Sequence, residues 1–535
     1  MNKNEIIKLL IEQLARKKIK TRDDFLILLK KLTRKYRFAP PSIAEIITSY
    51  RTLRSKRKIK KNEFIENQLK KRPIRSLSGV AVISVLTKPY PCPGHCLYCP
   101  TDKNFPKSYL PGEPAAERAR LLKYDPYKQV EYRLKTLQKI GHQTDKIELI
   151  IIGASWSAYP EKYKKWFVTR CFQAANADQR RQYADKRGRS TSLDEVQRKN
   201  EKARNRIISI SIETRPDLIT PKEIVKMRQL GITKIELGIQ ALDDKILEKN
   251  LRGHDLKKII KAAELLKNAG FKVCYHIMPG LYGSNPKKDL LMFKKLFSDQ
   301  SFQPDYLKIY PCVVTKGSQL YKVWKGGKYK PYSDKVLTEL LIKMKLVVPA
   351  YIRIIRVFRD IPSNKIEAGS KISNLREVVQ KEMEKKGTKC QCIRCREIKN
   401  TEFEIKNIKL IKREYKASDG KEIFLSFEDQ KQNKILAFLR LRLAILHTTG
   451  YVLNTLKDAT IIRELHTYGE IVEIGKKKKA ASQHKNLGRK LVEEAEKISK
   501  KYGYKKIAVI SGIGARPYWK KLGYQLKETY MVKKI

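Results

Sequence analysis

The chain has 535 residues, of which 41% are hydrophobic, so several domains with sizeable cores are expected. Its 117 lysine and arginine residues against 55 acidic ones give a formal net charge of +62, which favours a phosphate-rich partner, RNA above all, over a generically basic composition. No apolar run approaches the length of a membrane span and no secretory signal opens the chain, so we expect a cytoplasmic protein without a membrane partner.

The N-terminal part, residues 1–74, is predicted to be helical and basic. Apolar residues such as Ile6 and Leu10 recur at helical spacing. Two basic runs follow, at 54–61 and 70–72. A charge run is often only a solvated face, but two runs within a basic segment favour contact with RNA phosphates.

A regular alternation of strands and amphipathic helices begins near residue 79. The strands are rich in β-branched residues, and six strand–helix units predict a parallel sheet curled into a partial barrel over residues 75–310. The fold class is therefore α/β. The predicted strands are 80–86, 147–152, 207–213, 234–240, 272–278 and 306–310.

Three cysteines follow the first predicted strand. Cys92, Cys96 and Cys99 have C-x3-C-x2-C spacing, with Tyr98 before the last. Three thiolates can hold three irons of a [4Fe–4S] cluster and leave the fourth iron open. That iron can chelate S-adenosylmethionine, whose reductive cleavage gives a 5′-deoxyadenosyl radical, so the motif resembles the signature of the radical-SAM superfamily. Zinc is the alternative, but zinc sites usually have four ligands arranged as C-x2-C pairs.

Two further residues are expected at the mouth of this barrel. Glu213 and Gln240 lie at the carboxyl ends of later strands. Because the carboxyl ends of barrel strands share one mouth, we expect these residues to meet the cluster and its co-substrate there.

The connecting region, residues 311–400, holds a second cysteine group. Cys390, Cys392 and Cys395 form a C-x-C-x2-C triplet, and Cys312 lies upstream. Four thiolates would close a structural zinc site, with Cys312 as a guessed fourth ligand. Free thiols or a second cluster are the alternatives. Grouped rather than paired cysteines indicate metal binding in a reducing compartment.

The C-terminal part, residues 401–535, reads as a separate α/β unit. The order of its strands and helices fits a coenzyme-A-dependent acetyltransferase of the GNAT type, in which a loop before a helix offers backbone N–H groups to the pyrophosphate. Asn486 takes the place of the first glycine of that loop, and asparagine tolerates the positive φ that the turn requires. A simple helix cap is the alternative.

Several motifs in one order resemble the catalytic subunit of Elongator, in its single-chain archaeal form, from about residue 73 to the C-terminus. The resemblance implies an enzyme that forms carboxymethyluridine at the tRNA wobble position from acetyl-CoA, by adding a radical of the acetyl methyl group to carbon 5 of uracil. It also implies an anticodon-loop substrate and an electron donor, and leaves a homodimer open. The motifs are Tyr124-Asp-Pro-Tyr127, Glu213-Thr-Arg-Pro-Asp217, Glu236-Leu-Gly-Ile-Gln240, Asn250-Leu-Arg-Gly-His254, Arg359-Asp-Ile-Pro362, Arg463-Glu-Leu-His-Thr-Tyr-Gly469 and the cysteine loop.

The same resemblance implies roles for single residues. Lys146 matches a lysine tied to acetyl-CoA, and Tyr518 is expected as a polar catalytic contact. Trp519 and Ala154 stand where the family usually has tyrosine and glycine. The residues implied to contact the coenzyme are Lys146, Glu464, Leu465, His466, Thr467, Gln483, Leu487, Gly488, Arg489, Tyr518 and Trp519.

Three other functions are weighed against this one. A protein lysine acetyltransferase would use only the C-terminal unit, with Glu464 or Glu470 as base, and would leave the cysteine loop without a role. A radical-SAM methylthiotransferase needs three more cysteines upstream of Cys92, and none is present. An RNA-binding scaffold would not need correctly spaced cysteines.

Overall fold

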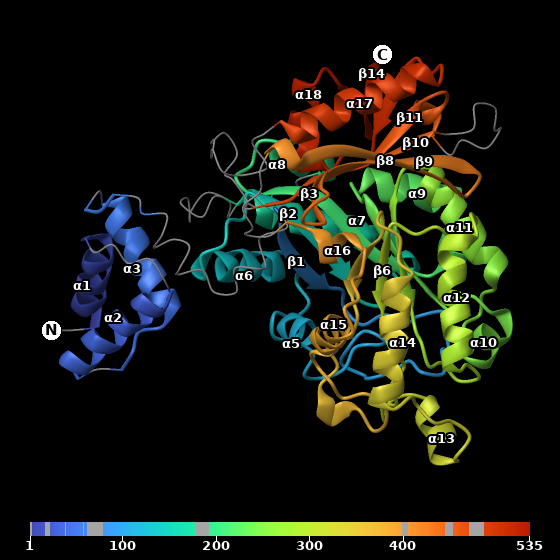
Figure 1. Cartoon of the computed structure of the whole chain (residues 1–535), viewed down its shortest axis with the longest axis horizontal. Coiled ribbons are helices and arrows are strands. Elements are labelled where there is room, and N and C mark those ends of the chain that lie inside the picture. Colours follow the sequence, from blue (N-terminus) through green and yellow to red (C-terminus); the bar gives the residue numbers. More distant parts are fainter. Residues whose placement is uncertain are drawn as a thin grey trace.

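Figure 1 presents the computed structural model of the chain, in which a small helical unit stands beside a larger body of two stacked sheets. In that body, the second sheet and its helices cover one end of a curled first sheet. None of the described helices has the length and apolar composition that crossing a bilayer requires. The structure describes residues 3–16, 22–37, 39–56, 58–60, 62, 79–177, 192–398, 405–443, 453–469 and 486–535.

The N-terminal unit consists of three helices around a core of its own. Leu10, Phe25 and Tyr50 are among its buried residues. The unit approaches the main body through the Arg51 guanidinium, which donates to the Gln138 carbonyl of a barrel helix. The predicted helical character of this part is confirmed. The helices are α1 (Lys3–Arg16), α2 (Arg22–Lys35) and α3 (Ile43–Ser55).

The first sheet is parallel throughout, and its strands follow the chain order from β1 to β7. The six strands predicted from the sequence are present. A seventh, β7, pairs with β6 and lies in the connecting region, so the sheet extends beyond the boundary expected at residue 310. Four residues, two isoleucines between two arginines, are too short a pattern to identify as a strand. The strands are β1 (Ala81–Leu86), β2 (Lys146–Ile152), β3 (Arg206–Thr214), β4 (Lys234–Gln240), β5 (Lys272–Ile277), β6 (Tyr306–Ile309) and β7 (Arg353–Arg356).

Helices cover the outer face of this sheet and bury alternate strand residues. In β1, Ile83 and Val85 are fully buried, whereas Val82 and Ser84 on the other face are half-buried. The curled sheet is therefore a half-barrel with an accessible interior. The helices are α5 (Pro114–Leu121), α6 (Pro126–Lys139), α7 (Glu161–Asn176), α8 (Leu193–Asn200), α9 (Pro221–Gln229), α10 (Asp244–Lys249), α11 (Leu256–Asn268), α12 (Pro286–Ser298), α13 (Leu320–Lys325), α14 (Asp334–Leu346), α15 (Leu375–Lys385) and α16 (Ile393–Arg396).

The second sheet has the order β13-β14-β12-β11-β10-β9-β8, and only β11 and β12 pair in parallel. Its long helix α17 packs Leu491 and Ala495 into a second core. The sequence did not predict β8, because half of its residues are charged and three of them, Lys412, Arg413 and Glu414, are consecutive. The elements are β8 (Ile408–Ala417), β9 (Gly420–Asp429), β10 (Lys434–Leu443), β11 (Thr460–Thr467), α17 (Leu487–Lys501), β12 (Lys506–Val509), α18 (Arg516–Lys521), β13 (Gln525–Lys527) and β14 (Tyr530–Lys534).

Buried charges join the two sheets. Asp305, directly before β6, accepts hydrogen bonds from Arg463 of β11, with 2.9 Å from Nη1 to Oδ2. Arg440 of β10 and Lys267 of α11 each lie 3.7 Å from the same carboxylate. All four side chains are almost fully buried. Breaking such a network leaves unpaired buried charge, so it holds the half-barrel and the second sheet in one relative position.

Candidate active site

The loop with the first three cysteines follows β1 at the carboxyl ends of the barrel strands. Backbone hydrogen bonds fix it: the Leu97 N–H donates to the Asn250 carbonyl at 3.0 Å, and the Leu97 carbonyl accepts from the Leu320 N–H at 2.7 Å. The Arg252 guanidinium donates to the Cys96 sulfur at 2.8 Å. A β-carbon added at Gly94 would lie 2.2 Å from the Arg215 guanidinium. Two guanidinium groups therefore lie against a loop whose thiolates would carry negative charge.

The donor set of this loop fits a [4Fe–4S] cluster better than a single ion. The sulfurs of Cys92, Cys96 and Cys99 do not form one of the described groups whose ligand atoms all lie within 4.8 Å of one another. A cube in which each thiolate binds a different iron needs sulfurs further apart than a single ion does. Three thiolates with a hydrogen-bonding guanidinium also match the way proteins hold and tune such clusters.

The two residues expected at the mouth lie at the carboxyl ends of their strands. The Glu213 carboxylate accepts from the Tyr109 hydroxyl and from the Lys308 amine, both at 3.1 Å. Gln240 ends β4 in the left-handed region with a φ of 70°, and its buried Oε1 has no hydrogen-bond partner among the described residues. A buried polar atom without a partner is costly, so Gln240 suits a site that a co-substrate completes.

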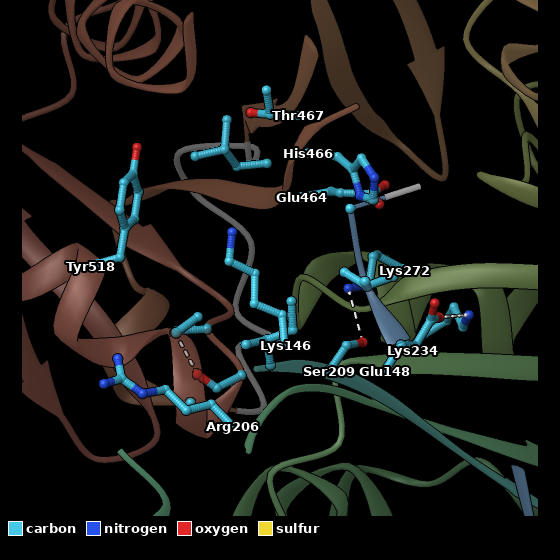
Figure 2. A pocket seen from close by; sticks show the side chains of 18 of the residues that line it. Lys146, Glu148, Arg206, Ser209, Lys234, Lys272, Glu464, His466, Thr467 and Tyr518 are labelled. Carbon is cyan, nitrogen blue, oxygen red and sulfur yellow. Dashed lines mark hydrogen bonds and ion pairs between the residues drawn. The ribbon is translucent and has the colours of Figure 1, made fainter. Parts of the chain in front are cut away.

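A large cavity lies between the half-barrel and the second sheet. Its volume is about 1110 Å³, and Figure 2 shows Lys146 and Tyr518 entering it from different units. It is lined by the first residues of β2, β3, β4 and β5 on one side and by Glu464–Thr467, the start of α17 and α18 on the other. The cavity thus opens at the amino ends of the barrel strands, opposite the cysteine loop.

The cavity also extends into the barrel. Ser84 and Ile150, from the middle of β1 and β2, and Arg356, at the carboxyl end of β7, belong to its lining. A half-barrel with an accessible interior can therefore connect the pocket at one end with the mouth at the other. The sequence had not placed the acetyltransferase residues relative to that mouth.

Most residues that the resemblance assigns to coenzyme A converge at one wall of the cavity. A β-carbon added at Gly488 would lie 3.2 Å from the Tyr518 hydroxyl and 3.6 Å from the Thr467 hydroxyl. Asn486 adopts the expected left-handed conformation, with a φ of 56°, and its own side chain does not cap the first turn of α17. The absence of a side chain at Gly488 keeps this place open, and the N–H groups at the start of a helix suit an anion.

Other predicted coenzyme contacts have different surroundings. Trp519 is 4% exposed and packs against Tyr524 in the second core, although it also borders the cavity. The Arg489 side chain points outward to Glu493, at 2.8 Å. Gln483 lies outside the described residues.

Burial and neighbouring charges set the ionisation of the cavity wall. Burial raises the pKa of Tyr518 to about 12, so its hydroxyl keeps its proton. Burial also lowers the pKa of Lys146, with Asp145 opposing. Although burial disfavours the charged form, Arg440 and Lys272 hold the pKa of Glu464 below its ordinary value.

A chain of charged residues that was not predicted from the sequence lies inside the barrel. Glu148 pairs with Lys234, which lies 3.9 Å from Glu236. Lys308 pairs with Glu236 and lies 3.1 Å from Glu213 at the mouth. Alternating charges thus link the cavity to the cluster end of the barrel. The sequence does carry a sign of this chain of charges. Glu148 is a charged residue inside an otherwise apolar run of β2, whereas a fully buried strand would carry no charge.

The second cysteine group is a separate site. The sulfurs of Cys390, Cys392 and Cys395 lie within 4.8 Å of one another, between β7 and the second sheet. The guess that Cys312 completes this group is wrong. Its N–H donates to the Pro279 carbonyl at 2.9 Å, and its thiol hydrogen-bonds to Tyr329 at the barrel mouth. The sequence did carry a signal for this position: Cys312 follows the predicted strand 306–310, and the carboxyl ends of barrel strands share one mouth.

Comparisons with known proteins agree with this arrangement. The Radical SAM superfamily matches residues 90–294, and the Radical_SAM C-terminal domain matches residues 304–385. The chain is 44% identical to the tRNA uridine(34) acetyltransferase of Methanocaldococcus jannaschii over 480 residues, which cover 87% of this chain and 86% of that protein. It is 36% identical to Elongator complex protein 3 of Homo sapiens over 484 residues, or 88% and 86% of the two chains.

A solved structure shares the fold. The archaeal Methanocaldococcus infernus Elp3 with an N-terminal deletion superimposes with a TM-score of 0.73 at 40% identity, and the match covers 86% of this chain and 100% of that one. The predicted combination of a partial parallel barrel with a second sheet domain is confirmed.

Proposed function

Because the chain belongs to the family of the tRNA uridine(34) acetyltransferases and Elongator complex protein 3, we propose that it forms a carboxymethyl group on uridine 34 of tRNA from acetyl-CoA. The family makes it a radical-SAM enzyme, so a [4Fe–4S] cluster and S-adenosylmethionine are its cofactors. When bound, they supply a radical able to take hydrogen from an unactivated methyl group.

The observation that carries this proposal is the cavity shared by the two catalytic halves. Its acetyltransferase wall and its barrel wall face the same space, and that space reaches into the barrel towards the cysteine loop. An acetyl group delivered by the second sheet would therefore be exposed to chemistry that starts at the barrel mouth.

Three parts of the cavity wall would have a role in this reaction. The first turn of α17, with Gly488, would hold the coenzyme pyrophosphate with backbone N–H groups. The protonated Tyr518 hydroxyl would donate to the thioester end of the coenzyme. Lys146, across the cavity, would approach a phosphate or the thioester carbonyl from the barrel side.

For the rival function, protein lysine acetylation, Glu464 is poorly suited as the base. Glu464 accepts from the Tyr306 hydroxyl through one oxygen and from the Arg440 guanidinium, at 3.0 Å, through the other. These partners and the lowered pKa make its carboxylate a weak base. Glu470, the other base considered, lies outside the described residues.

We also propose that Cys390, Cys392 and Cys395 hold a structural zinc ion, with a fourth ligand from outside this group. They lie where the barrel meets the second sheet, so the ion would stabilise that junction. None of the nine cysteines, all of which lie in the described residues, forms a disulfide, which suits a reducing cytoplasm.

The test is an anaerobic reaction of the reconstituted chain with a tRNA transcript, acetyl-CoA and S-adenosylmethionine, read by nucleoside mass spectrometry. Carboxymethyluridine should form at the wobble position, and not in the Cys96→Ser variant, which should also fail to build the brown chromophore. A transcript with cytidine at that position is the matched substrate control. Acetylation of a basic peptide without any modified nucleoside would contradict the proposal.

A further inference from the structure

A continuous stack of aromatic rings runs beside the cysteine loop. Tyr90 stacks on Tyr159 with ring centroids 4.8 Å apart, and Tyr159 stacks on Tyr163 at 5.0 Å. Tyr163 in turn contacts Trp166 at 5.6 Å. The four rings come from the strand-to-loop segment before the cysteines and from the start of α7. We refer to Tyr90, Tyr159, Tyr163 and Trp166 as the aromatic stack.

Hydrogen bonds hold the middle of the aromatic stack in place. The Tyr159 hydroxyl donates to the Lys88 carbonyl at 2.6 Å and lies 2.8 Å from the Thr87 hydroxyl. The Tyr163 hydroxyl accepts from the Lys88 N–H at 3.1 Å. Both rings are therefore fixed to the backbone that leads into the cysteine loop, and their contacts are permanent features of the fold.

The inner end of the aromatic stack reaches the first cluster ligand. Tyr90 precedes Cys92 by two residues, and the Cys92 sulfur lies 3.7 Å from the Ser155 hydroxyl, next to Trp156. Burial raises the pKa of Tyr159 to about 12, and the nearby Cys92 contributes to that shift. The indole of Trp156 lies 6.5 Å from the Tyr159 ring. Tyr159 therefore lies near the side of the loop that holds Cys92.

The outer end of the aromatic stack is open to solvent. Trp166 is 44% exposed, whereas Tyr159 is 3% exposed. Tryptophan that serves only to pack a helix onto a barrel is expected to be largely buried. Lys88, Lys162 and Lys165 are exposed around it, and the Lys88 amine lies 5.1 Å from the Tyr163 ring centroid. An exposed aromatic residue among cations suits the centre of a contact with an acidic protein.

We propose that the aromatic stack is the route by which electrons enter the cluster, and that Trp166 and the lysines around it receive an acidic, low-potential one-electron donor protein. In each transfer the donor is oxidised by one electron and the cluster is reduced from its 2+ to its 1+ state. No bond forms or breaks, and no proton has to move. The rings are not oxidised or reduced themselves; they fill the path with closely packed atoms, through which an electron tunnels better than through water.

This inference rests on the cluster assignment and is independent of the RNA substrate. The cluster needs an electron for every turnover, and the family membership does not say where that electron enters. The three contacts of the stack connect a solvent-exposed ring to the residue before the cluster loop, without a gap in the described structure.

The test measures reduction of the reconstituted cluster in the full chain, without tRNA or acetyl-CoA, by the loss of its visible absorbance and by the electron paramagnetic resonance signal of the reduced state. Reduced flavodoxin is the protein donor and dithionite the small one. Trp166→Ala should slow reduction by flavodoxin several-fold, and Trp166→Phe should restore most of the rate. Dithionite can reach the cluster from the open mouth, so its rate should change much less.

Tyr502→Ala is the matched control, because Tyr502 is 38% exposed on the second sheet domain, far along the chain from the stack. Before the rates are compared, the spectrum of the oxidised cluster and its change on adding S-adenosylmethionine should equal those of the parent. Equal rates with flavodoxin for Trp166→Ala, Tyr502→Ala and the parent would overturn the proposal. So would an equal slowing by both reductants, because the substitution would then disturb the cluster itself.

Discussion

Replacing Asp305 with asparagine should uncouple the half-barrel from the second sheet. Asp305 is fully buried and faces three cations, with Arg463 at 2.9 Å and Lys267 and Arg440 at 3.7 Å. Asparagine keeps the size of the side chain but removes the negative charge that compensates these three cations. Removing one partner of a buried ion network costs about 3–5 kcal/mol, because the remaining charges stay buried. We expect the free energy of unfolding to fall by that amount.

The loss should depend on pH. Burial lowers the pKa of Lys267 to about 8, and Asp305 is the main group that opposes this shift. The unfolded chain, with its ordinary value of 10.5, binds more protons, so this lysine makes folding less favourable at neutral pH. Without Asp305 its folded-state pKa falls further. The difference in the free energy of unfolding between Asp305→Asn and the parent should therefore be larger near neutral pH. It should narrow as the pH rises through 8, where Lys267 of the parent also loses its proton.

The assay is chemical denaturation followed by circular dichroism, with the first transition compared at about pH 7 and about pH 9. Asp360→Asn is the control, because Asp360 pairs with Arg356 at 2.7 Å on the surface and should contribute less than about 1 kcal/mol. A loss for Asp305→Asn no larger than that of the control would refute the reasoning. A large loss that is equal at both pH values would refute the role given to Lys267.

Three further outcomes follow from the site. Gly488→Val should weaken acetyl-CoA binding in calorimetry, because its β-carbon would lie 3.2 Å from the Tyr518 hydroxyl, whereas Gly326→Ala should leave binding unchanged. In protein without the three cluster cysteines, about one zinc per chain should remain, as metal analysis would show. Cys392→Ser should remove that zinc and lower the midpoint temperature of unfolding. If no zinc is found while Cys390, Cys392 and Cys395 are intact, these residues are free thiols and the zinc proposal is wrong. Deleting residues 1–74 should weaken tRNA binding and flatten its dependence on salt, since phosphate contacts release counterions; an unchanged slope would mean that the basic runs are only solvated.

Local patterns were enough to predict much of the fold and to propose the three cluster ligands. The three cysteines depend on spacing within one loop, and the six strands from β1 to β6 on runs of β-branched residues, so both could be predicted. The turn at Asn486 could also be anticipated, because positive φ is a property of single residues, and its φ of 56° confirms it. The strand pattern could not be recognised in the sequence where a strand is short, as in β7, or rich in charged residues, as in β8.

What the sequence by itself determined is therefore the type of each unit and the chemistry of its motifs, because strand period, helix period and ligand spacing are properties of neighbouring residues. Only the tertiary structure decided how the units meet. It placed Lys146 and Tyr518 in one cavity, paired Asp305 with Arg463 between the sheets, and separated Cys312 from the group of Cys390, Cys392 and Cys395. These residues lie far apart in the chain, and their contacts depend on how two sheets pack, which no local pattern records.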